Sequence, residues 1–331
     1  MGQKPPKERA NEYMAWLQER INHAYDVANK ARSKGYDPEP EVNIPVAKDM
    51  ADRVEGLIRS VAPQLVNQGL PERIKELEEK YGSLDWRVAL IIAEEVSKEK
   101  FCRFKDKREA MEVGIRAGFL YNTLGIVAAP LEGFIELELK QRRDGGEYFC
   151  IKYAGPIRGA GGTASSVSVL IADYVRIKNG YAEYDPDENE IERYVTEIND
   201  YNDRVTNLQY KPSDEEIRFL IKHMPVEVSG DPTERIEVSN HKDLDRMDTN
   251  QIRGGICLVV AEGVCQKCNK LWKRLSKWGV EMGIGWQWME EFISMQKKIK
   301  AKAKADTKEG DKPKITPNYT FITDMIAGRP V

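Results

Sequence analysis

The first part of the chain carries the hydrophobic spacing of helices. In residues 12–33 an apolar side chain recurs every three or four positions, which places these side chains on one face of a helix. That face consists of Leu17, Ile21, Ala24, Ala28 and Ala31. Four more segments with this spacing lie at residues 50–61, 71–81, 86–96 and 109–122. We predict an amphipathic N-terminal helix within residues 1–40 and a helix-rich start to a main domain of residues 41–295.

After these helical segments the period of the pattern changes to two. Ile135, Leu137 and Leu139 alternate with charged residues, as a half-buried strand requires. Asp144–Gly145 is a strong hairpin signal, and residues 147–153 continue as a second strand. The pattern predicts a β-hairpin in the middle of the chain.

Mixed elements follow the hairpin. Helical spacing is found at residues 164–178, 187–208, 217–223 and 256–277. Ser213 and Glu216 have the spacing of a capping box before the third of these helices, and Gly279 is expected to end the last. Two short apolar segments, 225–229 and 235–239, are strand candidates. Helices, then a hairpin, then mixed helices and short strands favour an α+β fold over a regular alternation of strands and helices.

The end of the chain differs in composition. Residues 297–314 contain eight lysines and three acidic residues with few apolar side chains, which is typical of a solvated linker or a frayed helix end. We assign residues 296–316 to a lysine-rich linker. Apolar character resumes over residues 317–331, and because the chain stops within this segment we expect it to be a truncated piece of a longer polypeptide.

Composition narrows the class of protein. The 331 residues are 41% hydrophobic and 32% charged, with a formal net charge of −3. The chain is therefore long enough for one or two cores, but it is not the strongly basic molecule that binds nucleic acid over its whole surface. No apolar run is long enough to span a bilayer and no secretory signal is present, so we expect a soluble cytoplasmic protein without membrane contact. Five scattered cysteines argue against a secreted disulfide framework.

A glycine-rich turn lies between the predicted hairpin and the helix that follows it. Gly159, Gly161 and Ala164 fit the G-x-G-x-x-A spacing of dinucleotide-binding turns. However, the preceding strand is a hairpin arm rather than a buried parallel strand, and no lysine follows as a Walker phosphate loop requires. The dinucleotide interpretation is therefore weak.

Two other interpretations of this turn remain open. It can be a tight corner in which glycines permit positive φ and Thr163 caps the next helix. Alternatively it can be an anion site, in which Arg158 and the amides of Gly161 and Gly162 face a nucleic-acid phosphate.

A second turn also combines an arginine with glycines before a helix. Arg253 is followed by Gly254 and Gly255 at the start of the predicted apolar helix. Either the two glycine turns pack directly against each other, or the two arginines share a phosphate-facing surface.

Cys265 and Cys268 have the spacing of a zinc half-site, but no second pair of cysteines or histidines completes four ligands. They fall at i and i+3 of a predicted amphipathic helix, so helix packing is the alternative. No nucleophile–base pair or paired carboxylates point to catalysis, so we predict no catalytic residue and no resident metal in this chain.

Four segments together carry a resemblance. They are "KYAGPIRGAGGTASSVSVLIADYVR", "RVTNLQYKPSDEEIR", "DTNQIRGGICLVVAEGV" and the terminal "IAGRPV". Read together, they resemble the N-terminal part of the large subunit of the archaeal family D DNA polymerase (DNA polymerase II), and the similarity extends over nearly the whole chain. The resemblance implies a two-subunit replicative enzyme. Its large subunit performs nucleotidyl transfer with Mg²⁺ on aspartates that lie further along the polypeptide, and its small subunit is a 3′→5′ exonuclease.

The resemblance also implies partners for this chain: the small exonuclease subunit, the rest of the large subunit, and DNA. Because no segment here matches the catalytic aspartates, no catalytic residue is carried over. We expect a structural, assembly and DNA-proximal region, inactive by itself. The alternatives are a stand-alone nucleotide-binding enzyme that uses the Gly159–Ala164 turn, and a pure protein-interaction domain.

Overall fold

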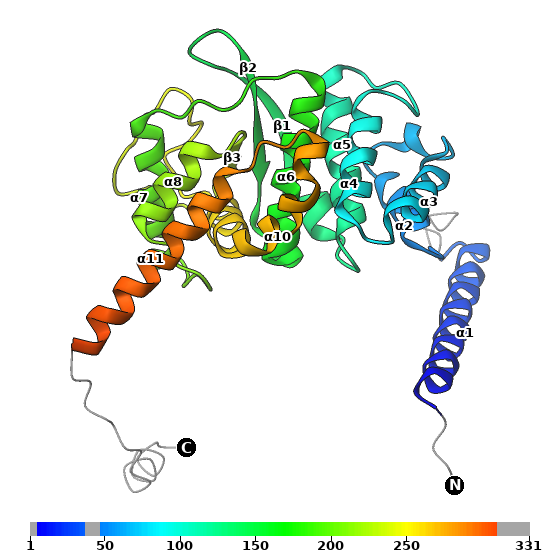
Figure 1. The fold of residues 1–331 in the computed structure, drawn as a ribbon. Coiled ribbons are helices and arrows are strands. Elements are labelled where there is room, and N and C mark those ends of the chain that lie inside the picture. The colour runs from blue at the N-terminus through cyan, green and yellow to red at the C-terminus, as the bar shows by residue number, and fades with distance from the viewer. Residues whose placement is uncertain (1–4, 37–46, 310–331) are drawn as a thin grey trace, which may run out of the picture.

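The structure is a computed structural model that describes residues 5–36 and 47–309. Helices surround a small sheet, which confirms the predicted α+β class (Figure 1). The elements before the sheet are α1 (Pro6–Ser33), α2 (Met50–Ile58), η1 (Pro63–Leu65), α3 (Leu70–Tyr81), α4 (Trp86–Ser97), α5 (Lys107–Asn122) and the π-helical turn η2 (Ala129–Gly133). All five predicted helices of this region are present.

The predicted hairpin is formed by β1 (Phe134–Gln141) and β2 (Glu147–Tyr153), which pair antiparallel. Gly145 in its turn has a φ of 89°, a conformation that favours glycine. The third strand, β3 (Glu227–Gly230), pairs parallel with β2, so the described sheet is mixed with the order β1-β2-β3. The first short strand candidate is thus confirmed, whereas the second is reduced to one bridge between Glu237 and Gln251.

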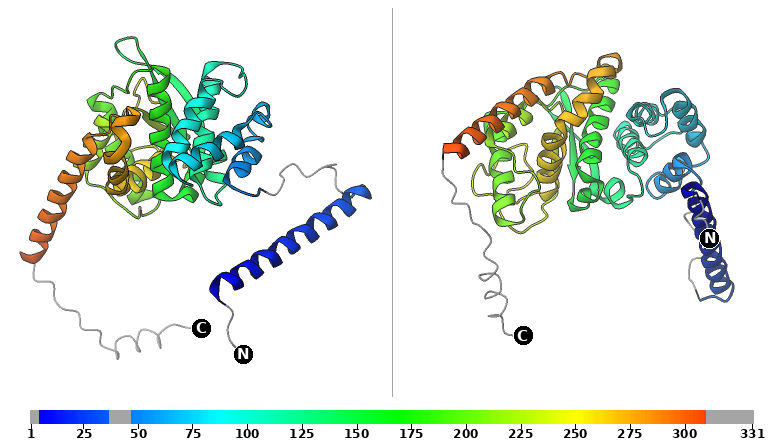
Figure 2. Two further views of the ribbon diagram at one scale, coloured as in Figure 1. Left: turned by 45° about the vertical axis from the view of Figure 1, so that its right-hand side comes forward. Right: turned by 60° about the horizontal axis from the view of Figure 1, so that its bottom comes forward.

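The elements after the hairpin, apart from β3, are helical. They are η3 (Gly155–Ala160), α6 (Gly161–Asn179), α7 (Glu188–Arg204), α8 (Asp214–His223), α9 (Gly254–Cys257), the π-helical η4 (Leu258–Cys265), α10 (Gln266–Met282) and α11 (Trp288–Glu309). Figures 1 and 2 show α2–α5 on one side of the body, α7 and α8 on the other, and α6 between them. One cluster of buried apolar residues extends from Ala51 to Ile293 and joins the two sides.

Helix α6 is the centre of this core because its residues 165–176 are all buried. On one side it packs against α5, whose Gly118 would place a Cβ 3.2 Å from Ile171 and 2.7 Å from the carbonyl oxygen of Ala89. The missing side chain lets three helices pack closely. The position of α6 fixes the glycine-rich turn at its N-terminus.

Helix α8 begins at the capping box that the sequence predicted. Ser213 accepts from the backbone N–H of Glu216, whose carboxylate accepts from the backbone N–H of Ser213. Helix α7 ends at Arg204, four residues before the predicted end. The side chain of Asn202 accepts from the backbone N–H of Leu208 and turns the chain away from the helix axis.

The predicted helix over 256–277 differs from the structure. Its first part is the short α9 followed by the π-helical η4, and α10 then continues to Met282. The expectation that Gly279 ends the helix was wrong. Gly279 is buried inside α10, and Gly283, with a φ of 77°, is the C-cap.

The two ends of the described chain contrast. None of the residues of α1 is buried, and the helix stands apart from the body in Figures 1 and 2. Helix α11 runs through the boundary predicted at residue 296, where Gln296 is buried and donates to Glu216. Residues 297–309 of the predicted linker continue α11, and residues 310–331 lie outside the described residues. No described helix is long and apolar enough to cross a membrane.

Candidate nucleic-acid interface

The first glycine turn brings one predicted residue to the surface. Arg158 lies in η3, is exposed, and makes no hydrogen bond or ion pair within the described part of the chain. Burial raises the pKa of Tyr201, and the positive charge of Arg158 opposes that rise. The guanidinium is therefore available to an anion from solvent. Gly161 links η3 to α6 with a φ of 70° and has open space around it.

Gly162 and Thr163 contact the C-terminal half of the protein. A Cβ at Gly162 would collide with the carbonyl oxygen of Glu262 in η4 and lie 2.7 Å from Lys267. Thr163 is not the N-cap, which is Ala160, and its hydroxyl accepts from Lys270 at 3.1 Å. Since Gly162 serves a close approach of backbone to backbone, it leaves no room there for the pyrophosphate of a dinucleotide.

The second glycine turn is in the interior. Arg253 is 1% exposed and donates to Glu197 from its backbone N–H (2.6 Å) and its guanidinium (2.8 Å). The same guanidinium donates to Ser229 and lies over the ring of Tyr194. Burial alone would lower the pKa of Arg253, but the carboxylate of Glu197 outweighs it and raises the pKa. The structure thus places this arginine in a buried ion pair, away from the exposed surface that holds Arg158.

The glycines after Arg253 are packing positions. A Cβ at Gly254 would lie 2.6 Å from the hydroxyl of Thr233, and one at Gly255 would collide with the carbonyl oxygen of Tyr153. Tyr153 ends β2, immediately before the first glycine turn. The two turns therefore pack closely through glycine, which is the first of the two alternatives left open by the sequence.

The two candidate metal-binding cysteines are buried. The thiol of Cys265 lies 3.9 Å from the carboxylate of Glu216, and that of Cys268 lies 3.9 Å from the carbonyl oxygen of Met289. Burial raises the pKa of both thiols, to about 12 for Cys268, which disfavours the thiolate that metals bind. Among residues 5–36 and 47–309, no group of three or more His, Cys, Asp and Glu side chains is placed to hold a metal ion. We therefore assign no metal-binding role to Cys265 and Cys268.

Sequence reasoning missed a row of basic residues on α10. We call this row the basic stripe; it consists of Lys267, Lys270, Lys273, Arg274 and Lys277. Their spacing of three and four residues places them on one side of the helix, and all but the half-buried Lys267 are exposed. None of the five forms an ion pair with any residue that the structure describes. The pattern K-x₂-K-x₂-K-R-x₂-K is present in the sequence, but it is interleaved with the apolar positions that predict this helix.

The basic stripe begins at the first glycine turn. Lys267 touches the position of Gly162, and Lys270 binds Thr163. The dipole at the N-terminus of α6 adds positive potential at this end, although the backbone N–H of Gly161 is itself bonded to the carbonyl oxygen of Arg158. The predicted residues Gly161, Gly162 and Thr163 are thereby joined to lysines that lie more than 100 residues further along the chain.

The far end of the stripe borders α4. Arg274 lies over the ring of Trp86, with its guanidinium carbon 4.4 Å from the ring centre. Lys277, Arg274 and Arg87 line a shallow cavity of about 450 Å³. Despite burial, Arg87 and then Arg274 hold the pKa of Asp85 below its ordinary value. Two carboxylates act on these cations, because Glu281 of α10 also helps to raise the pKa of Arg87.

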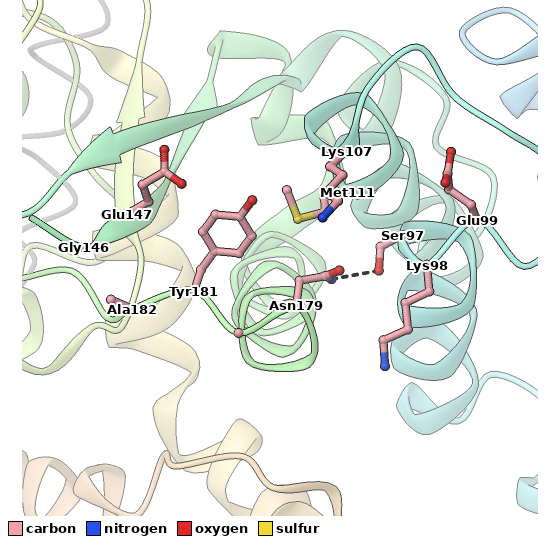
Figure 3. Close-up of a pocket in the computed structure, with 11 residues that line it drawn as sticks. Ser97, Lys98, Glu99, Lys107, Met111, Gly146, Glu147, Asn179, Tyr181 and Ala182 are labelled. Carbon is pink, nitrogen blue, oxygen red and sulfur yellow. Dashed lines mark hydrogen bonds between the residues drawn. The ribbon is translucent and has the colours of Figure 1, made fainter.

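Another cavity of about 450 Å³ lies between the ends of α4 and α6 and the hairpin turn (Figure 3). Its polar groups are largely occupied by one another or by neighbours. Asn179 donates to Ser97 at 3.0 Å, Lys98 pairs with Glu94, and Glu147 accepts from Gln141. Since this cavity holds no nucleophile beside a base, we assign it no chemistry.

The basic stripe can attract polyanions although the whole chain is slightly acidic. A cation without a protein counter-ion can pair with a phosphate without first losing an ion pair. A straight row of cations along a helix can contact consecutive phosphates of a nucleic-acid backbone. The stripe offers no group that could activate a nucleophile. It is suited to binding rather than to catalysis.

Comparisons with known proteins identify the family of this chain. Residues 12–295 match the family described as DNA polymerase II large subunit DP2, N-terminal. The chain is 44% identical to the DNA polymerase II large subunit of Nanoarchaeum equitans over 96% of its length and 28% of that protein. It is 44% identical to the large subunit of Methanosarcina barkeri over 100% of its length and 27% of that protein. For Pyrococcus horikoshii the identity is 40% over 98% of this chain and 23% of the relative. The chain thus spans about a quarter of the curated relatives that it matches, and it belongs to the family of DNA polymerase II large subunits, as their N-terminal region.

Proposed function

We propose that this chain is the structural and DNA-proximal region of the large subunit of a two-subunit replicative DNA polymerase. Nucleotidyl transfer, with Mg²⁺ as its metal, belongs in this proposal to the remainder of the large subunit, and 3′→5′ exonuclease activity to the small subunit. The chain itself holds the phosphate backbone of DNA. The observation that carries this role is the unpaired basic stripe beside the N-terminus of α6.

Charge pairing elsewhere in the protein makes the stripe distinctive. Basic side chains on other elements are commonly paired, for example Arg73 with Glu95, Arg218 with Glu192 and Arg246 with Glu190. The five cations of the basic stripe have no such partner among residues 5–36 and 47–309. At one end of the row, half-buried Arg87 is paired with Asp85 and lines the same cavity as Arg274 and Lys277. At the other end, exposed Arg158 precedes Gly162, the position that Lys267 approaches.

The assembly role rests on α1. The sequence of this helix is amphipathic, but no residue of the helix is buried. Its large apolar side chains are therefore exposed to solvent. They are Tyr13, Met14, Trp16, Ile21 and Val27. Exposed apolar surface of this kind marks protein–protein contact. We propose that α1 contacts the small subunit or the rest of the large subunit, in the cytoplasm where replication takes place.

The DNA-binding role is tested with Lys273→Ala/Lys277→Ala. Each exposed charge pair is worth about 0.2–1 kcal/mol, so the affinity of the chain for a fluorescein-labelled blunt duplex should fall by roughly two- to thirtyfold, as measured by fluorescence anisotropy. The matched control is Arg103→Ala/Lys242→Ala, which also removes two surface cations, but from other elements where each is paired with a glutamate. An equal loss of affinity in both double variants would show that only net charge matters and would refute the assignment to α10.

A further inference from the structure

A small cavity opens beside the basic stripe. It lies between the start of α4, the start of α6 and the loop after α5, and its volume is about 330 Å³. This size is at the small end of ligand pockets. Trp86, Ile126 and Ala164 give it apolar walls, and Lys270 and Arg274 of the stripe form part of its rim.

The loop after α5 presents apolar side chains to solvent next to this cavity. Leu124 is 61% exposed and Val127 is 45% exposed. The loop is nevertheless held in place, because the guanidinium of Arg53 donates to the carbonyl oxygens of Leu120 (3.0 Å) and Ile126 (2.7 Å). Exposed apolar side chains on a fixed loop indicate a contact surface.

Two polar groups of the cavity are free to recognise a ligand. The side-chain amide of Asn122 is half-buried and has no hydrogen-bond partner among the described residues. The guanidinium of Arg274 lies over the ring of Trp86, and Arg274 is itself exposed. An arginine plane stacks on a base, and an amide can donate to and accept from the edge of a base.

We propose that this cavity receives one unpaired nucleobase of a DNA strand whose phosphates lie along the basic stripe. The inference rests on the DNA-binding role proposed above and adds the state of the DNA that is recognised. A paired base is enclosed in the stack of the double helix, so a cavity of this size accepts only a base that is turned out or single-stranded. The apolar walls replace the lost stacking, Arg274 covers one face of the base, and Asn122 contacts its edge.

The test compares two fluorescein-labelled DNAs: a blunt duplex, and the same duplex with a single 2-aminopurine bulge. The wild-type chain should bind the bulged duplex at least about fivefold more tightly, the low end of the stacking contribution of one base. Binding should also change the fluorescence of the 2-aminopurine. Ala164→Leu, which fills the cavity, and Asn122→Ala, which removes the free amide, should abolish the preference and leave the affinity for the blunt duplex unchanged.

The control is Ala128→Leu, which adds the same side chain at an exposed position outside the cavity and should keep the preference. Circular dichroism verifies that each variant is folded; if Ala164→Leu is not, Asn122→Ala and Leu124→Ala decide. Equal binding of both duplexes by the wild type, or an unchanged preference in folded cavity variants, would overturn the inference while DNA binding through α10 stood. A chain that binds neither duplex would overturn both proposals.

Discussion

A buried carboxylate joins α7 to the turn before α9. Glu197 is fully buried and accepts from Arg253 and from Nε of Arg193, which lies at 3.2 Å. Both guanidiniums are buried as well. The variant Glu197→Gln keeps the size of the side chain but removes its charge, so two buried cations lose their shared counter-ion.

The size of the effect follows from this geometry. Removing one partner of a buried ion pair costs about 3–5 kcal/mol, because an uncompensated charge remains in the interior. Here one carboxylate serves two arginines, and Arg193 also holds the loop before α9 through the carbonyl oxygens of Thr249 and Gln251. We therefore expect the free energy of unfolding to fall by about 3–5 kcal/mol, a large part of the stability of an ordinary domain.

Urea unfolding followed by far-UV circular dichroism measures this change. Glu192→Gln on the same helix is the matched control, since its partner Arg218 is largely exposed and surface pairs contribute little. A Glu197→Gln variant whose unfolding midpoint and slope resemble those of Glu192→Gln would refute the reasoning, because it would mean that the interior tolerates both guanidiniums without a carboxylate.

Two further predictions concern the glycine turn and the acid side of stability. Gly162→Ala should lower the free energy of unfolding by about 1–3 kcal/mol, because its Cβ meets the backbone carbonyl of Glu262. The control Gly159→Ala should change this free energy little, because its Cβ would meet only Ile126, at 3.8 Å. Equal melting temperatures for the two variants would contradict the close approach of Gly162 to Glu262. For Glu216, burial alone would raise the pKa, but hydrogen bonds from Tyr210, Ser213 and Gln296 lower it below the ordinary value. The stabilisation from Glu216 is therefore complete above the unfolded pKa of about 4.3 and is lost as the pH falls through the folded pKa; Glu216→Gln should flatten this acid-side decline in urea unfolding, and an unchanged pH profile would count against it.

Local signals in the sequence were sufficient for much of the fold. The five N-terminal helical stripes, the Asp144–Gly145 hairpin and the Ser213 capping box depend on residues close together in the chain, and the structure contains all of them. The prediction that α10 ends at Gly279 was wrong because a glycine can serve either as a helix cap or as a packing position. Only the contacts of Gly279 with Leu275 and Ile284 distinguish the two roles.

The candidate site was harder to predict because it is assembled from distant segments. Arg158 and Arg253 look alike in sequence, since each precedes a pair of glycines or a glycine-rich stretch. Only the buried Glu197, 56 residues before Arg253, separates the interior arginine from the exposed one. The approach of Lys267 and Lys270 to Gly162 and Thr163 is likewise a tertiary contact that no local spacing encodes.

The salt dependence of DNA binding tests the central claim most directly. Each cation that neutralises a phosphate of duplex DNA contributes about 0.9 to the slope of log affinity against log salt concentration. If α10 lies along the phosphate backbone, Lys273→Ala/Lys277→Ala should reduce the magnitude of that slope by about 2 relative to the wild-type chain, whereas Arg103→Ala/Lys242→Ala should leave it unchanged. Parallel salt plots for the wild type and the α10 variant would contradict the account.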